Sequence, residues 1–346
     1  MPENPSSILL IADPGAPAAI AERLSDSLRD ALAVESAEDG PRDVSVRYHA
    51  YPVDEYAEVS EVIRTIEPGH KPEDIIIYLT DLPRRQGTTP VMAEISLPDR
   101  LGVISIPAVG GLSIDRRIKK VAQAVVAEIA GRSDEKTPSV KRLKRTQVDG
   151  VVRYVAPPAL SRLRLLMGMV YANRPWRLVS GLSKVMMAAF AAGAVSLAYP
   201  TIWQLSDTMG PGRLTAATLL ASGALIAWLI LDHELWERPH SAGERKRAVL
   251  YNATTLVTLT IGVAIFHIGL YVLILVTAWW TLPPELVARN IGHSVGFSTV
   301  LVVTWLVAAI ATLGGALGSG MEDGEAVKAA AYGARQRQRF EQEKAR

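Results

Sequence analysis

The chain has 346 residues, enough for about two domains of roughly 100–200 residues each. Apolar residues make up 49% of it and charged residues 21%, the formal net charge is +2, and there is no cysteine. The lack of cysteine excludes disulfides, iron–sulfur clusters, thiolate zinc sites and cysteine nucleophiles, and long charge-free stretches exclude a wholly soluble, disordered or fibrous chain.

Residues 7–131 alternate between short apolar runs, which are typical of buried strands, and amphipathic helical periods. The expected order is strand 7–12, helix 18–34, strand 44–50, helix 55–66, strand 74–80, at least one strand within 91–97 and 101–109, and helix 114–129. Strands that alternate with helices favour a parallel sheet covered on both faces. We therefore predict an α/β fold, a small flavodoxin- or Rossmann-like three-layer cytoplasmic domain, over residues 1–132.

Residues 133–181 are expected to connect this domain to a membrane. The stretch 132–158 is polar, basic and interrupted by prolines, which predicts a linker, and one short strand is compatible with residues 151–155. The stretch Leu160–Trp176 mixes Leu and Met with Arg, a pattern that indicates an interfacial helix whose cations face anionic lipid head groups. A plain solvated connector is the alternative.

Residues 182–320 contain the long stretches without any Asp, Glu, Lys or Arg. A helix needs about 20 apolar residues to cross a hydrocarbon core of roughly 30 Å. We therefore predict an all-α domain of four transmembrane helices in a lipid bilayer, with spans near 184–205, 213–232, 250–282 and 295–318. The third is interpreted as one long helix, and a break near Gly262 or Gly269 is the alternative.

The distribution of Lys and Arg predicts the orientation of these spans. The segment 132–184, the loop 238–247 and the tail 321–346 together carry 22 of these cations, whereas the opposite side carries only Arg213 and Arg289. Cations accumulate in cytoplasmic loops. We therefore expect a multi-pass protein of the bacterial plasma membrane with both termini, including the tail, in the cytoplasm, and the apolar run at residues 8–12 is too short for a cleavable signal.

Candidate ligand-binding residues lie where the predicted strands end, because ligands of such sheets bind beyond the carboxyl ends of the strands. These candidates are Asp13, Gly15, Asp81, Arg84, Gly110 and Gly111. Backbone N–H groups that follow two glycines at a helix start are suited to hold an anion. Each candidate also has a structural interpretation, a tight turn for the glycines and helix capping or loop hydrogen bonds for the acids.

The sequence predicts no catalytic residues, no metal site and no cofactor. The segment around Gly110 and Gly111 departs from both the dinucleotide fingerprint and the phosphate-loop pattern. His267 is the one ionisable side chain expected near the middle of a span. It is either a neutral histidine bonded to a neighbouring helix or part of a proton or ion pathway.

Four segments of the sequence resemble those of a known protein family. They are Leu10-Ile11-Ala12-Asp13-Pro14-Gly15, Tyr78-Leu79-Thr80-Asp81-Leu82-Pro83-Arg84-Arg85, Ile106-Pro107-Ala108-Val109-Gly110-Gly111 and Ala172-Asn173-Arg174-Pro175-Trp176-Arg177. Together they resemble an uncharacterised bacterial membrane protein family with a small α/β head and a few transmembrane helices, sometimes labelled methylene-tetrahydrofolate dehydrogenase. That enzyme class uses a Tyr-x-x-x-Lys pair, and no tyrosine of this chain has lysine four residues later, so we do not expect the labelled activity.

Three functions are compatible with this pattern. The favoured one is a cytoplasmic α/β binding or regulatory module, anchored by four transmembrane helices that form a homo-oligomer or bind a membrane protein partner. Small residues spaced four apart, such as Gly314 and Gly318, suit close helix packing. The alternatives are a pore or transporter subunit with His267 near the pathway, and a membrane-bound enzyme that uses the strand-end residues Asp13 and Asp81. No nucleic-acid partner is expected.

Overall fold

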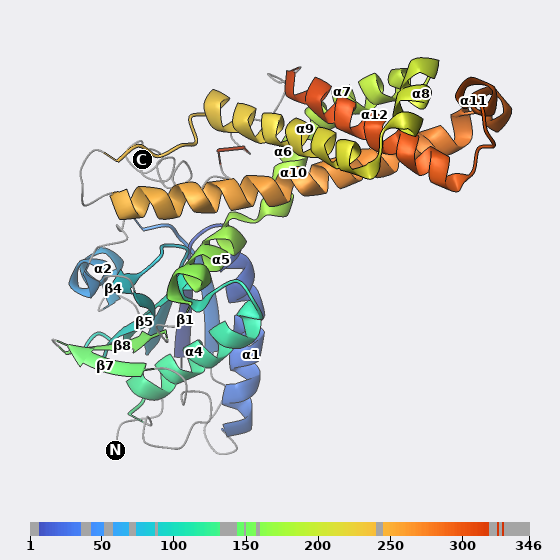
Figure 1. Cartoon of the computed structure of the whole chain (residues 1–346). Helices are drawn as coiled ribbons and strands as arrows, with labels where there is room; N and C mark the ends of the chain where they lie inside the picture. The colour runs from blue at the N-terminus through green and yellow to red at the C-terminus, as the bar shows by residue number, and fades with distance from the viewer. Residues whose placement is uncertain are drawn as a thin grey trace. The chain divides into compact units, whose positions relative to one another are not determined.

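The protein divides into two compact units, with the boundary between Asn173 and Arg174 (Figure 1). The structure is a computed structural model. It describes residues 7–35, 43–51, 58–68, 74–86, 89–131, 144–148, 150–156, 160–239, 245–317, 324, 327 and 328. Of the predicted tail, therefore, only three residues are described.

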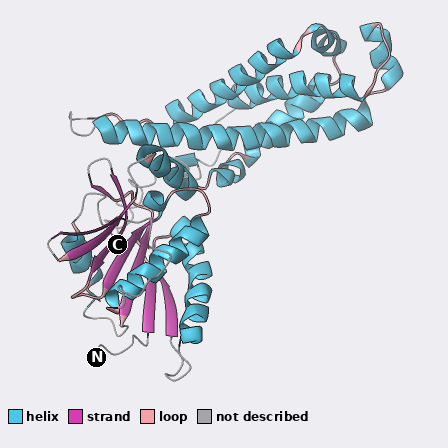
Figure 2. Cartoon of the chain, turned by 60° about the horizontal axis from the view of Figure 1, so that its bottom comes forward, coloured by secondary structure: helices cyan, strands magenta, loops and turns pink. Residues whose placement is uncertain are grey.

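The first unit is built on one sheet, drawn in magenta in Figure 2. The strand order is β2-β1-β3-β6-β5-β8-β7, and β4 pairs with β5. The strands are β1 (Ser7–Ala12), β2 (Asp43–Tyr48), β3 (Ile75–Thr80), β4 (Arg85–Gln86), β5 (Thr89–Ser96), β6 (Leu101–Ser105), β7 (Lys144–Val148) and β8 (Val151–Val155). Strands β2, β1, β3 and β6 are parallel, whereas β5 runs antiparallel to β6 and β8. The α/β prediction is confirmed, but the predicted parallel pairing holds only for β2, β1, β3 and β6, so the sheet is mixed.

Short connections explain the antiparallel half of the sheet. A parallel crossover needs a dozen or more residues, whereas an antiparallel pair can be joined by a tight turn. Only the turn 97–100 lies between β5 and β6, and only residues 149 and 150 lie between β7 and β8. The expected linker therefore contains a hairpin that extends the sheet, and both 91–96 and 101–105 are strands.

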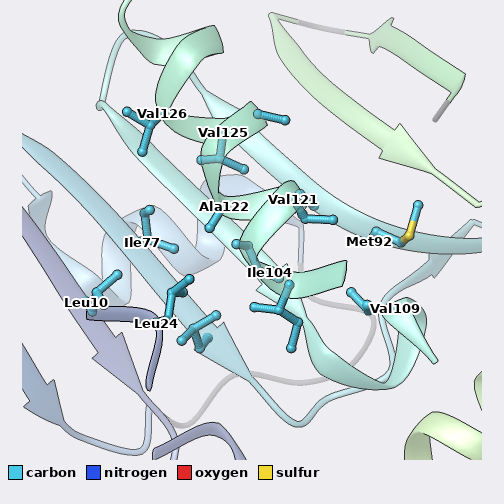
Figure 3. Close-up of a cluster of buried hydrophobic side chains, with 14 of the residues drawn as sticks. Leu10, Leu24, Ile77, Met92, Ile104, Val109, Val121, Ala122, Val125 and Val126 are labelled. Atoms are coloured by element: carbon cyan, nitrogen blue, oxygen red, sulfur yellow. The ribbon is translucent and has the colours of Figure 1, made fainter. Parts of the chain in front are cut away.

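Helices cover both faces of the sheet. They are α1 (Ala16–Glu35), α2 (Val59–Ile66), α3 (Ile106–Val109), α4 (Ile114–Ile129) and α5 (Ser161–Asn173). Leu10 of β1 packs in one core with Leu24 of α1 and Val121 of α4, as Figure 3 shows. Its neighbours Leu9 and Ile11 point to the other face and pack in a second core that includes α2, as the two-residue period of a strand requires.

The second unit is helical. Its elements are η2 (Pro175–Arg177), α6 (Leu178–Gly181), α7 (Ser183–Ser196), α8 (Pro200–Thr208), α9 (Pro211–Asp232), α10 (Arg245–Thr281), α11 (Pro284–Ile291) and α12 (Phe297–Leu317). Within the described residues, α9, α10 and α12 are long and apolar enough to cross a membrane. A fourth span is reached only if the bent helix pair Ser161–Gly181 and Ser183–Ser196 counts as one.

The first and third predicted spans have different outcomes. The stretch 184–205 is not one helix, because α7 ends at Ser196 and α8 begins at Pro200. Proline is tolerated at this first helical position because its missing N–H would have no partner within the helix. Residues 250–281 of the third predicted span lie in one continuous helix of 37 residues, as predicted, and the helix ends one residue before the predicted end. Gly262 does not break this helix: a Cβ there would lie 2.5 Å from a methyl group of Leu178, so the glycine permits close packing.

Candidate functional site

Asp13 lies directly after β1, next to the end of β3, and its carboxylate is buried among hydrogen-bond donors. Its Oδ1 accepts a hydrogen bond from the Tyr78 hydroxyl at 2.6 Å, and its Oδ2 accepts from the Thr80 hydroxyl at 2.7 Å and the Asp81 N–H at 3.2 Å. The β1–β3 register, which pairs Ala12 with Leu79, sets these distances. Asp13 is only 1% exposed, so these neighbours replace the water that a carboxylate otherwise requires.

Aromatic rings connect the Asp13 carboxylate to the surface. The ring of Tyr78 meets the edge of Tyr51 at a centroid distance of 5.6 Å, and Tyr51 meets His49 at 4.5 Å. Burial raises the pKa of Tyr51, which makes its hydroxyl harder to ionise. His49 is exposed, so these three aromatic side chains extend from solvent to the buried Asp13 carboxylate.

The turn after Asp13 explains Gly15. The backbone of Gly15 has φ of +102°, a conformation that glycine adopts without steric penalty. This turn lets the Ala18 N–H donate to the Asp13 carbonyl at 3.1 Å. The structure thus brings Asp13, Gly15 and Asp81 together at the carboxyl ends of β1 and β3.

Arg84 belongs to a buried ionic cluster that the sequence analysis did not identify. Its Nε donates to Glu94 Oε2 at 2.6 Å, and Arg153 Nε donates to Glu94 Oε1 at 2.9 Å. Glu94 and Arg153 face each other across β5 and β8. The only sequence signal for this cluster is one acid and one base within two expected strands, and it becomes specific only when the register is known.

Gly110 and Gly111 lie against α5. A Cβ on Gly111 would come within 2.6 Å of the Met167 carbonyl oxygen, and a Cβ on Gly110 would come within 2.9 Å of Arg164 Cγ. Gly168 of α5 in turn touches the backbone of Pro107. The three glycines allow α5 to pack more closely against α3 and the turn that follows it than residues with a Cβ would allow.

This close packing predicts that Gly168→Ala destabilises the α/β unit by about 1–3 kcal/mol, the usual effect of an overpacked contact. Its Cβ would meet backbone atoms of Pro107, which cannot turn away as a side chain can. The matched control is Gly223→Ala in α9, where a Cβ meets open space and a gain of up to about 1 kcal/mol in helix propensity is expected. Melting of the two full-length variants in detergent checks both values, and equal melting temperatures would contradict the prediction.

A second buried carboxylate, Glu128 of α4, ties the β7–β8 hairpin to the helix. It accepts hydrogen bonds from the Tyr154 hydroxyl at 2.7 Å and from Arg145 at 2.7 Å. Burial and this bond to Glu128 raise the pKa of Tyr154. The hairpin is therefore held to the domain by polar as well as backbone contacts.

His267 of α10 is bonded to α12. Its Nδ1 lies 2.9 Å from the Thr312 hydroxyl oxygen, and that hydroxyl donates to the Ala308 carbonyl at 2.8 Å. Because the hydroxyl hydrogen is used in that bond, the oxygen accepts and Nδ1 carries the proton. The histidine therefore joins two apolar helices as a hydrogen-bond donor.

The sequence candidates do not form one group in the part of the chain that is described. Asp13, Gly15 and Asp81 lie together, Arg84 lies in the Glu94 cluster, and Gly110 and Gly111 lie under α5. No group of three or more His, Asp or Glu suited to a metal occurs among the described residues. Comparisons of the chain with models of protein families, with curated proteins and with solved structures find no match.

Proposed function

We propose that the chain is an integral membrane protein in which a cytoplasmic α/β binding or regulatory module is attached to the bacterial plasma membrane by four transmembrane helices. One observation carries the proposal: a compact unit with a mixed sheet is continuous with a unit that contains three helices long and apolar enough to span a membrane. Of the bent helix pair, only the part that follows Asn173 and ends at Ser196 would supply the fourth span, because α5 belongs to the α/β unit.

The α/β unit supports the proposed class of module. Its parallel strands have the order β2-β1-β3-β6, which agrees with the first four strands of a flavodoxin-like sheet. We assign the unit to that class. Asp13 and its three hydrogen-bond donors lie at the carboxyl ends of the strands, where such domains bind their ligands. The buried hydrogen bonds of Asp13 favour a supporting role for this residue beneath such a ligand over direct catalysis.

The helical unit supports an anchor rather than a pore. Polar side chains of its apolar helices bond one another, as His267 does with Thr312 and as the Trp305 indole does with Thr218 at 2.9 Å. Polar groups that are satisfied between helices stabilise packing. The homo-oligomer or membrane partner that such helices would bind is part of the proposal.

Cysteine accessibility tests the attachment and the orientation, because the chain has no cysteine of its own. Thr208→Cys and Gln147→Cys each place a single thiol at an exposed position, at the end of α8 and on β7 respectively. In intact spheroplasts an impermeant maleimide should label Thr208→Cys alone, and Gln147→Cys should react only after permeabilisation. Recovery of the full chain in the supernatant without detergent would overturn the attachment, and labelling of Gln147→Cys from outside would overturn the orientation.

A further inference from the structure

A surface of the α/β unit combines arginines with leucines that face solvent. We call it the arginine–leucine surface, and it consists of Leu112, Arg116 and Arg117 at the start of α4 and Leu160, Leu163 and Arg164 at the start of α5. The leucines are 69%, 74% and 51% exposed, in that order. Leucine side chains exposed to this extent within one small area mark an interaction site.

Glycine contacts hold the two helix starts together as one surface. The Cβ position of Gly110 lies 2.9 Å from Arg164 Cγ and 3.4 Å from Arg117 Nη1, so the two arginines flank the same point. Gly111 beside it touches Met167 of α5. Leu160 lies three residues before Leu163 and four before Arg164, and Leu163 lies four residues before Met167, so these side chains are neighbours along one side of α5.

The charge of this surface is positive. Arg116 and Arg117 are exposed, and Arg164 is half-buried. The neighbouring acid, Asp115, is engaged by Arg23 of α1 at 2.7 Å. Two guanidinium groups on either side of Gly110 repel each other, and an anion between them would remove that repulsion.

We propose that the arginine–leucine surface docks on anionic phospholipid head groups, with its leucines entering the boundary between the head groups and the acyl chains. The proposal rests on the proposed membrane attachment and identifies the part of the α/β unit that faces the lipid. Basic side chains interleaved with apolar ones are the pattern of interfacial binding. Chain continuity also favours it, since α5 is the last helix before the unit with the apolar helices.

Single-cysteine labelling of the full chain tests this docking. Leu112→Cys and Leu163→Cys place an environment-sensitive fluorophore on the surface, and Leu97→Cys serves as the control. Leu97 is also exposed, but it lies in the turn before β6, at the amino end of that strand, whereas Leu112 follows its carboxyl end. In nanodiscs with phosphatidylglycerol, the probes at 112 and 163 should shift to the blue and be quenched by spin-labelled lipid, and the probe at 97 should do neither.

Charge removal tests the anionic part of the proposal. Arg116→Gln with Arg117→Gln should remove about half of the quenching at position 163, because basic side chains near an anionic surface contribute comparably to attraction. Arg47→Gln with Arg64→Gln removes the same charge from exposed positions on β2 and α2, and it should leave the quenching unchanged. In nanodiscs of phosphatidylcholine alone, the chain that keeps both arginines should show quenching at position 163 as weak as that of the Arg116→Gln, Arg117→Gln variant.

The outcomes separate this proposal from membrane attachment itself. If the chain stays in the nanodisc while the probes at 112 and 163 remain in water, the docking is refuted and the attachment stands. If the blue shift is equal in phosphatidylcholine, an apolar or protein contact covers the leucines, and the anionic lipid is refuted. If the chain does not enter nanodiscs at all, the proposed function fails first.

Discussion

Replacing Glu94 with glutamine is expected to destabilise the α/β unit by about 3–5 kcal/mol, because a buried ionic group that loses one partner leaves the other charge uncompensated. The side chains of Glu94 and Arg84 are 7% and 6% exposed, and Arg153 shares the same carboxylate. For a unit of this size each kcal/mol lowers the melting temperature by about 2–4 °C. Proteolysis of the full-length variant along a temperature ramp, with fragments of the α/β unit quantified, would measure the shift.

Two further variants test the cause of this effect. Asp26→Asn breaks the exposed pair between Asp26 and Arg29, 3.4 Å apart, and should change stability by no more than about 0.5 kcal/mol. Changing Glu94 to Leu together with Arg84 and Arg153 to Met should recover most of the loss, because an apolar cluster of similar volume carries no desolvation penalty. A triple variant as unstable as Glu94→Gln would show that the cluster acts through shape rather than charge.

Much of the α/β unit could be predicted from local sequence. The strand 7–12 and the helix 114–129 have the same bounds in the structure as in the prediction, because burial on both faces gives a continuous apolar run and an amphipathic helix gives a 3.6-residue period. Strand direction is not encoded in this way. The chain reverses at residues 97–100, and hydrophobicity alone does not reveal whether the next strand pairs parallel or antiparallel.

The helical unit shows a second limit. Residues 185–205 contain no charge, so average hydropathy treats them as part of one span, although Pro200 starts a new helix within them. Proline cannot continue the preceding helix, because it lacks the N–H and its ring blocks the previous turn. The long helix 245–281 was predictable for the opposite reason, since its interior contains no proline.

The positions of the candidate residues at the strand ends could be predicted from the sequence, but their hydrogen-bond partners could not. Parallel strand ends meet at one edge, and this placed Asp13 beside Asp81. The partners of Asp13, Tyr78 and Thr80, lie inside an apolar strand whose polar side chains gave no signal by themselves. Glu94 and Arg153 lie 59 positions apart and become neighbours only through a hairpin that the sequence analysis interpreted as a linker.

Asp13→Ala is expected to destabilise the α/β unit by about 3–5 kcal/mol, because buried donors that lose their acceptor each cost about 1–3 kcal/mol. The donors are the hydroxyls of Tyr78 and Thr80 and the N–H of Asp81. Tyr78→Phe removes one donor and leaves the carboxylate two, so a loss of only about 1 kcal/mol is expected for it. Thermal unfolding of the full-length variants in detergent provides the comparison.

The sign of the Asp13→Ala effect separates two roles for this residue. A carboxylate that serves to bind a ligand commonly lowers the stability of the protein without the ligand. Its removal then leaves the melting temperature unchanged or raises it. A carboxylate that binds the protein's own donors stabilises the fold, and its removal lowers the melting temperature. Because Asp13 accepts from three groups of its own chain and is 1% exposed, we expect the second result, and a variant as stable as the parent would instead favour direct ligand binding by Asp13.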